Sequence, residues 1–432
     1  MTKPIDWDAA TNEAVGILRE YIRIDTSNPP GNEERAVAFL GGILASEGIR
    51  YETAAPAPGR SNLIAHIGPG TGGICLLNHT DVVPVERQFW GIDPFGGDVR
   101  DGYIWGRGAL DMKAMGVIEL MTVILLKRQE VRLKRAVTFL AVADEEAGSE
   151  FGAAWLERNR PDWLDAELVI NEGAYGVADL TGGTTPVFSF APGEKVPLWL
   201  RLVTRGRPGH GSVPHGDNCA ERLVKALDRI RNWQQEARVT PVMRAHFEAL
   251  AAAGLGPGGS EAAILASAAG NPAARARLAN TISLTTISTG VKVNVIPAEA
   301  SATLDCRLLP DADADEFMAA LGAVIDDERV EVEVLNRYQG ASSPLDSEFT
   351  RTVAEVCAEM VEGARLAPEL TPGFTDSRIY RVRGTPAYGF VPCLLPMEDL
   401  ATIHGHNERI SIENIRLGLQ VMYEVVRRLC SA

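Results

Sequence analysis

The chain has 432 residues, a length that predicts two or three domains. Its residues are 46% hydrophobic and 23% charged, and these proportions are typical of a globular protein. Its 42 basic and 57 acidic side chains give a net charge of −15 without any basic stripe, which excludes a nucleic-acid partner. No segment reaches the roughly 18 uncharged apolar residues of a membrane span, so no membrane partner is expected. The N-terminal segment also lacks the apolar core of a signal peptide.

The six cysteines are scattered along the chain without any CxxC spacing. Several lie inside apolar runs, such as Cys75 in "GGICLL". This distribution predicts free, buried thiols. Because free thiols persist in a reducing compartment, we expect a cytoplasmic protein.

The first part of the chain alternates between helix and strand patterns. Helical spacing of apolar residues covers 8–24 and 33–48, with the Pro/Gly-rich loop "DTSNPPGNE" between them. Three apolar runs then end in polar residues: "GICLLNHTD", "AVTFLAVADEE" and "AELVINEG". A predicted helix at 113–129 separates the first two runs. This order predicts a mostly parallel sheet covered on both faces, with a ligand site beyond the carboxyl ends of its strands.

The pattern changes near residue 193. Strands are predicted at 196–206, 281–288, 299–309 and 330–337, with helices at 218–236 and 314–326 and an Ala/Gly-rich stretch up to about 278. This β-α-β-β-α-β order indicates a ferredoxin-like domain. Helices at 347–363 and 411–429 then resume the first pattern. We therefore expect an α/β protein in which residues 193–338 form a domain inserted into a larger one made of 1–192 and 339–432.

Histidines and acids lie at the ends of the predicted strands. His79 and Asp81 share one face of an extended strand, so the carboxylate can hold the imidazole, although both could instead face solvent. Asp111 ends a glycine-rich turn before a helix, where an Asp often serves as a helix cap. Glu172 follows the third apolar run in "NEG", and "IHGHNE" supplies His404 and His406.

The run "DEE" at 144–146 concentrates negative charge after a buried strand. Two carboxylates about 4 Å apart repel by roughly 4 kcal/mol at an effective dielectric constant of 20. An exposed turn or the first turn of a helix would relieve this repulsion, and so would a cation. Glu145 and Glu146 can serve one site only if the strand breaks into a turn, because an extended strand sends neighbouring side chains to opposite faces. Gly148 favours such a turn.

Taken together, these side chains predict a pair of divalent cations. Two imidazoles and several carboxylates at successive strand ends of one sheet form the mixed N and O ligand set that suits zinc. The HExxH helix, the P-loop and the GxSxG motif are absent, and no serine or cysteine nucleophile has a convincing partner. These observations leave water activated by metal as the nucleophile.

Seven motifs in order resemble the dizinc metallopeptidase family of aminoacylase, succinyl-diaminopimelate desuccinylase and glutamate carboxypeptidase. They are "NHTDVVP", "GRGALDMKAMG", "ADEEAGSEFGA", "NEG", "GRPGHGSVP", "VNVIPAE" and "IHGHNE", and the resemblance spans about residues 10–428. The loop "APGEK" and the Ala-rich insertion are most similar to the carboxypeptidase S branch. The resemblance implies a dizinc exopeptidase-like catalytic domain with an inserted lid and dimerisation domain.

The same resemblance implies a role for each residue of the metal site. Asp111 would bridge two zinc ions, with cobalt or manganese as alternatives, and a cis peptide bond would join it to Met112. One zinc would also bind His79 and Glu172, and the other Glu146 and His404, which motif spacing favours over His406. Glu145 would be the general base, and Asp81 would orient the His79 ring.

The inserted domain would contribute to substrate binding. His210 would reach into the site of a partner subunit in a homodimer and stabilise the oxyanion, unless it is a loop histidine without a role. Asn294 and Arg307 would bind the carbonyl and carboxylate of the substrate, because an arginine fork matches a carboxylate. Arg378 is a further candidate for the carboxylate, although it could simply pair with Asp376.

The resemblance therefore implies a zinc hydrolase that cleaves an amide bond adjacent to a free carboxylate. The substrate would be a small molecule or peptide, either an N-acyl amino acid or a C-terminal peptide bond. A dipeptidase or aminopeptidase of the same family is the alternative, and a silent binding homologue is a third. Arg307 weighs against an aminopeptidase, and the presence of Glu145 weighs against a silent homologue.

Overall fold

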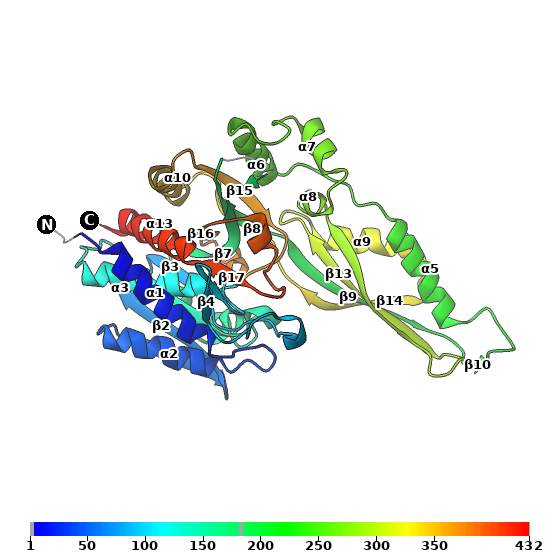
Figure 1. Ribbon diagram of the computed structural model, residues 1–432. Helices are drawn as coiled ribbons and strands as arrows, with labels where there is room; N and C mark the ends of the chain where they lie inside the picture. The colour runs from blue at the N-terminus through cyan, green and yellow to red at the C-terminus, as the bar shows by residue number, and fades with distance from the viewer. Residues whose placement is uncertain (1–3, 181–184, 432) are drawn as a thin grey trace.

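The computed structural model describes residues 4–180 and 185–431 (Figure 1). Residues 1–3, 181–184 and 432 of the predicted larger domain lie outside the described residues. Two separate sheets organise the chain, a larger one near both termini and a smaller one that extends away from it (Figure 1).

Within the described residues, eight strands form the larger sheet in the order β1-β2-β6-β3-β7-β16-β8-β15. The pairs β6–β3, β3–β7, β7–β16 and β8–β15 are parallel, whereas β1–β2, β2–β6 and β16–β8 are antiparallel. The strand bounds are β1 Tyr51–Ala57, β2 Arg60–Ile67, β3 Ile74–His79, β6 Val137–Val142, β7 Leu168–Val177, β8 Val187–Glu194, β15 Arg365–Thr371 and β16 Ala387–Leu395. The prediction of a mostly parallel sheet is confirmed.

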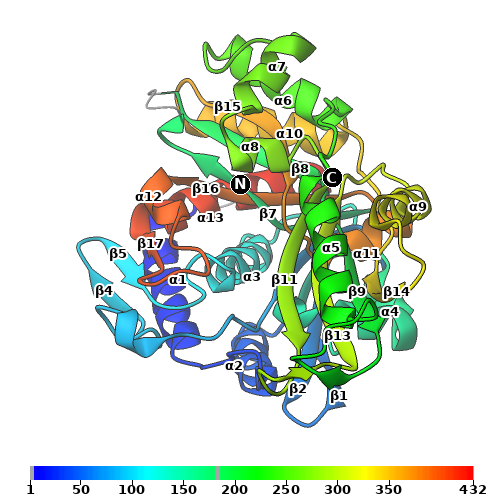
Figure 2. The ribbon, with the colours of Figure 1, turned by 90° about the vertical axis from the view of Figure 1, so that its right-hand side faces the viewer.

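Helices cover both faces of this sheet. On one face lie α1 (Trp7–Ile22), α2 (Glu33–Ser46), α3 (Lys113–Arg128), α10 (Glu348–Met360) and α13 (Ile412–Cys430). On the other lie α4 (Ala153–Asn159) and α11 (Ser377–Val382). Successive strand residues pack on opposite faces, so that Leu76 joins the first layer and Leu77 the second. Figure 2 shows α1, α2 and α3 side by side in the first layer.

The smaller sheet belongs to the segment from 196 to 337, all of which is described. Its order is β11-β13-β9-β14, with β9 Val196–Arg205, β11 Thr281–Thr289, β13 Glu299–Leu308 and β14 Val330–Arg337. Helices α5 (Cys219–Asn232) and α9 (Ala314–Ile325) cover one face, where Leu200, Leu304 and Phe317 are buried. Trp199 and Arg307 lie on the opposite face, since each occupies a register position one residue away from the buried row. The element order is the predicted β-α-β-β-α-β.

The Ala/Gly-rich stretch before residue 278, where the sequence predicts no element, contains helices α6 (Pro241–Ala252), α7 (Glu261–Ala268) and α8 (Pro272–Ala276). Their first turns are capped by the side chains of Thr240, Ser260 and Asn271. Helix α6 packs against the edge of the larger sheet, where Phe247 and Leu370 share one apolar cluster. This stretch therefore links the two sheets.

Shorter elements complete the described chain. They are η1 Arg87–Phe89, β4 Asp98–Arg100, β5 Tyr103–Trp105, η2 Glu145–Ala147, η3 Pro161–Leu164, β10 Gly209–His210, β12 Val295–Ile296, α12 Met397–Leu400 and β17 Arg409–Ser411. All six cysteines lie in the described part, and they are free and buried, as predicted. Across the described residues, no helix combines the length and the apolar character needed to cross a bilayer.

Candidate metal centre

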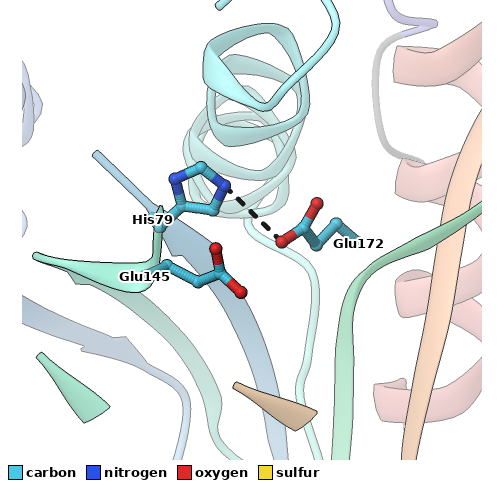
Figure 3. Close-up of side chains that lie close together, drawn as sticks. All are labelled: His79, Glu145 and Glu172. Atoms are coloured by element: carbon cyan, nitrogen blue, oxygen red, sulfur yellow. Dashed lines mark ion pairs between the residues drawn. The ribbon is translucent and has the colours of Figure 1, made fainter. Parts of the chain in front are cut away.

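The three apolar runs form neighbouring parallel strands, β6-β3-β7, and their polar residues meet at one edge of the larger sheet. His79 is the last residue of β3, and its Nε2 lies 3.5 Å from Glu172 Oε1 (Figure 3). Strand β7 continues to Val177, so Glu172 lies inside it and not at its end as predicted. The paired register of β3 and β7 nevertheless stops at Ile170, so Glu172 lies beyond the last paired residue.

Asp111 lies between two imidazoles. Its Oδ1 is 3.1 Å from His79 Nε2, and its Oδ2 is 3.0 Å from His404 Nε2. It does not cap the following helix, because the N-cap residue of α3 is Met112 and no side chain caps that end. The peptide bond from Asp111 to Met112 is cis, as expected. Each carboxylate oxygen therefore faces a different histidine.

The predicted break after β6 is present as the 3-10 turn η2, Glu145–Ala147. Asp144 before the turn and Gly148 after it have φ of 68° and 106°, which takes the chain out of the extended conformation. Ligand atoms of Glu145 lie within 4.8 Å of those of His79 and Glu172, and those of Glu146 lie equally close to His79 and Asp111. Both glutamates therefore face one cluster (Figure 3 shows Glu145).

The two C-terminal histidines have different surroundings. His404 Nε2 lies 3.2 Å from Glu146 Oε1 in addition to its contact with Asp111. His406 instead faces Glu86 at 3.7 Å and packs on the Phe89 ring. The structure thus brings His404, and not His406, to the cluster.

Asp81 contacts more than the His79 ring. The His79 Nδ1 donates a hydrogen bond to the Asp81 carbonyl oxygen at 3.0 Å and lies 3.4 Å from its carboxylate, so Nε2 is the nitrogen that faces Asp111 and Glu172. The Asp81 carboxylate also accepts the backbone N–H groups of Glu145 at 3.1 Å and Glu146 at 3.2 Å. It therefore orients the imidazole and the η2 turn together, and the second contact was not predicted from the sequence.

The cluster carries excess negative charge. Burial and the neighbouring carboxylates raise the pKa of Glu145 and of Glu172 well above the usual range. Burial also opposes ionisation of Asp111, but its hydrogen bonds to His404 and His79 lower its pKa overall. Among the described residues, no lysine or arginine forms an ion pair with these acids. Two imidazole nitrogens and several carboxylates without a basic partner fit the ligand set of divalent cations.

Glu408 is a further residue that shapes the cluster, although the sequence assigned it no role. Its buried carboxylate accepts the backbone N–H groups of Leu110 at 2.6 Å and Asp111 at 3.1 Å. Arg107 pairs with it at 2.5 Å. Glu408 therefore ties the loop of His404 to the loop of Asp111. Its partners are mostly backbone amides, which leave no signal in the side-chain pattern.

His210 and Asn294 are not brought to the cluster within one chain. They lie in and beside the short β10–β12 pair, at the end of the inserted segment far from the larger sheet (Figure 1). Both side chains are exposed. The Nδ1 of His210 accepts the Ser212 backbone N–H at 3.2 Å, which leaves its proton on Nε2.

Arg307 and Arg378 meet at the junction of the two sheets. Their guanidinium carbons lie 5.1 and 5.3 Å from the centre of the Phe374 ring. Arg307 pairs with Asp305 at 2.8 Å, and Arg378 pairs with Asp376 at 3.3 Å, which is the alternative considered for it. Two cationic groups from different parts of the chain therefore share one aromatic ring.

Residues 75–428 match the family described as "Peptidase family M20/M25/M40". The chain belongs to this peptidase family. The resemblance inferred from the seven motifs is thereby confirmed, whereas the position near the carboxypeptidase S branch stays a prediction.

Two relatives of this M20 peptidase are an aminoacylase and an N-fatty-acyl-amino acid synthase/hydrolase. Aminoacylase-1A of Rattus norvegicus is 30% identical over 430 residues, covering 97% of this chain and 95% of that protein. "N-fatty-acyl-amino acid synthase/hydrolase PM20D1" of Xenopus tropicalis is 32% identical over 377 residues, covering 82% of this chain and 71% of that protein. Family membership and these similarities make the chain a hydrolytic enzyme of aminoacylase type.

A solved M20 structure shares the fold. The metallo-carboxypeptidase Sso-CP2 from Sulfolobus solfataricus superposes with a TM-score of 0.75 at 19% identity. The match covers 96% of this chain and 99% of that one, so it includes both sheets.

Proposed function

We propose that this M20 hydrolase cleaves an amide bond next to a free carboxylate, either in an N-acyl amino acid or at the C-terminus of a peptide. The observation that carries the proposal is the position of Asp111, whose two oxygens face His79 and His404 separately. A carboxylate in this position can bridge two cations, and a pair of cations is suited to hydrolysing amides. The similarity to aminoacylase-1A supports the substrate class.

Five side chains would hold the two cations. His79 and Glu172 would serve one, Glu146 and His404 the other, and Asp111 both. Zinc suits the mixed nitrogen and oxygen ligands, and cobalt or manganese could replace it. When bound, the cations would polarise the amide carbonyl and favour deprotonation of water.

Glu145 would act as the general base. It lies beside the cluster and, among the described residues, pairs with no lysine or arginine, so its carboxylate is available to take a proton from water and return it to the leaving amine. The Asp81 carboxylate, which accepts the Glu145 backbone N–H, would keep this side chain in place.

Arg307 and Arg378 would recognise the free carboxylate, and Asn294 the substrate carbonyl. Both guanidinium groups lie at the junction of the two sheets, close to the Phe374 ring. Their present partners, Asp305 and Asp376, would hold them in place until a substrate carboxylate competes for their free N–H groups.

The inserted segment would form a homodimer, in which His210 completes the site of the other subunit. Strand β11 is an edge strand, and Leu284 and Ile287 on it are 48% and 59% exposed. Such an edge can pair with a second copy. The Nε2–H of His210 is a suitable donor for an oxyanion. The six free, buried cysteines support a cytoplasmic location.

The test is a hydrolysis panel with enzyme that has been stripped by a chelator and reconstituted with zinc, cobalt or manganese. N-acyl amino acids and dipeptides are compared with the same compounds carrying a carboxamide in place of the carboxylate. We expect activity only after reconstitution, and a loss of about 100-fold or more with the carboxamides. Equal rates on both sets would refute carboxylate recognition, and a strict requirement for a free amino group would indicate the alternative, a dipeptidase or aminopeptidase.

A further inference from the structure

We propose that Arg60 is a positioning residue that holds the turn carrying Glu145 and Glu146, acting through the carboxylate of Asp144. This inference rests on the proposed function, because it assigns Arg60 a part in the same reaction. Arg60 is the first residue of β2 and does not belong to any of the seven motifs.

The Arg60 guanidinium is enclosed by partners from two loops. Its NH2 group donates to Asp144 Oδ1 at 2.6 Å and to Glu33 Oε1 at 2.7 Å, and its Nε lies 2.7 Å from Glu33 Oε2. Its NH1 group donates to the Pro30 carbonyl oxygen at 3.0 Å. The Phe151 ring covers the guanidinium, with its centre 4.7 Å from the central carbon. Arg60 therefore joins Pro30 and the start of α2 to the loop at 144–151.

Asp144 transmits this constraint to the turn. It immediately precedes η2 with a left-handed backbone, which is unfavourable for a residue with a side chain unless other contacts hold it. Its Oδ2 accepts the Phe151 N–H at 3.1 Å, and its carbonyl accepts the Ser149 N–H at 2.6 Å. The carboxylate thus closes the loop that presents Glu145 and Glu146.

A second link runs through Asn28. Its side-chain amide donates to Asp144 Oδ1 at 2.9 Å and to Asp81 Oδ2 at 2.8 Å. Asp81 in turn accepts the N–H groups of Glu145 and Glu146. The chain of contacts from Arg60 to the proposed base therefore contains only buried side chains and the turn itself.

Charge explains why this position needs an arginine. Glu33, Asp81 and Asp144 form a third group of acids whose oxygens lie within 4.8 Å of one another, and all three are buried. Unlike the two groups that contain His79, this one includes an internal cation, because Arg60 pairs with both Glu33 and Asp144. Removing the guanidinium would leave these carboxylates repelling one another beside the turn.

The loop at Gly31 packs closely against Arg60. A Cβ atom at Gly31 would lie 2.6 Å from Arg60 Nε and 2.6 Å from Glu33 Oε2. Gly31 also has φ of 105°, which only glycine adopts readily. The loop therefore approaches the guanidinium closely, and a shorter or differently shaped cation cannot reproduce all of its contacts.

The test compares Arg60→Ala and Arg60→Lys with the wild type and with Arg128→Ala. Arg128 also pairs with two glutamates, but on the exposed surface away from the cluster. Three quantities are measured on each folded variant: kcat, KM and the affinity for cobalt of the metal-free protein. Each measurement on Arg60→Ala is repeated with millimolar guanidinium chloride, and with sodium chloride at equal ionic strength.

We expect kcat of Arg60→Ala to fall by about 100-fold while KM changes less than about threefold, because the base is misplaced but substrate binding is not. Cobalt affinity should fall for the second ion, bound by Glu146, and stay unchanged for the first. Guanidinium chloride, but not sodium chloride, should restore part of the kcat and part of the affinity for the second cobalt ion. The values for Arg60→Lys should lie between those of Arg60→Ala and those of the wild type, and Arg128→Ala should match the wild type.

Wild-type kcat and cobalt affinity in a folded Arg60 variant would overturn the proposal. A loss that guanidinium does not reverse, or that affects both cobalt ions and the fold equally, would also overturn it in favour of a purely structural role. If the wild type hydrolyses no substrate of the panel, the proposed function fails, while the cobalt titration still decides whether Arg60 positions the turn.

Discussion

The carboxyl edge of the larger sheet and the far end of the inserted segment both contain predicted site residues, but they differ in how complete they are. At the sheet edge, Asp111 lies within 3.1 Å of two imidazoles, and Glu408 and Asp81 hold the surrounding loops through backbone amides. At the far end, His210 and Asn294 are exposed and have only local partners.

The two regions therefore differ in whether one chain alone brings their side chains together. The sheet edge is assembled within one chain, with its acids buried and oriented before any ligand binds. Within the described residues, His210 and Asn294 of the inserted segment have no contact with the same chain's cluster, so the role proposed for them would require closure or a second subunit. Substitutions in the two regions should therefore differ in whether a second subunit can restore the lost activity.

The largest effect is expected for Glu145→Gln. An amide cannot accept the proton from water, so kcat should fall by about 100- to 10,000-fold. Metal content should stay at the wild-type level, since the Glu145 backbone N–H still binds Asp81. Glu150→Gln is the matched control, because that side chain lies in the same loop, is exposed and pairs only with Arg158. Unchanged kcat in Glu145→Gln would remove it as the base.

An intermediate effect is expected for His210→Ala, with a loss of about 100- to 1,000-fold in kcat if an oxyanion donor is removed. Coexpression of His210→Ala and Glu145→Ala subunits separates the two regions. If His210 acts across a dimer, random pairing should leave about a quarter of all sites in the mixture with an intact set of residues. If each chain is self-contained, the mixture should be as inactive as its components.

The smallest effect on catalysis is expected for Glu408→Gln, which removes a buried charge but keeps the side-chain shape. Arg107 would lose its ionic partner, and the free energy of unfolding should fall by about 3 kcal/mol, measured by denaturant titration. Metal affinity should fall as well, because the Asp111 loop loses its anchor. Glu413→Gln, on the exposed first turn of α13, should leave both quantities unchanged.

Strand ends were the part of the site that the sequence predicted well. Apolar runs that stop at "NHTD" and "ADEE" indicate neighbouring parallel strands, and the ends of such strands meet at one edge by geometry alone. The break after Ala143 could also be predicted, because Glu145 and Glu146 cannot face one site from an extended strand. Local patterns sufficed wherever the backbone direction decided the outcome.

Contacts between distant loops could not be predicted. Arg60 and Asn28 reach Asp144 across 84 and 116 residues, and no spacing rule relates such positions. Glu408 binds backbone amides, which every residue type except proline supplies. The Ala-rich stretch forms helices whose apolar residues pack on β15, but weak periodicity hides that contact in the sequence.

The central claim, that Asp111 joins two cations in one site, is tested most directly by metal analysis of the wild type and of Asp111→Asn after dialysis against zinc. Asparagine keeps the size of the side chain but offers one oxygen in place of two. We expect two ions per chain in the wild type and at most one in the variant. One ion or none in the wild type, or an unchanged count in Asp111→Asn, would contradict it.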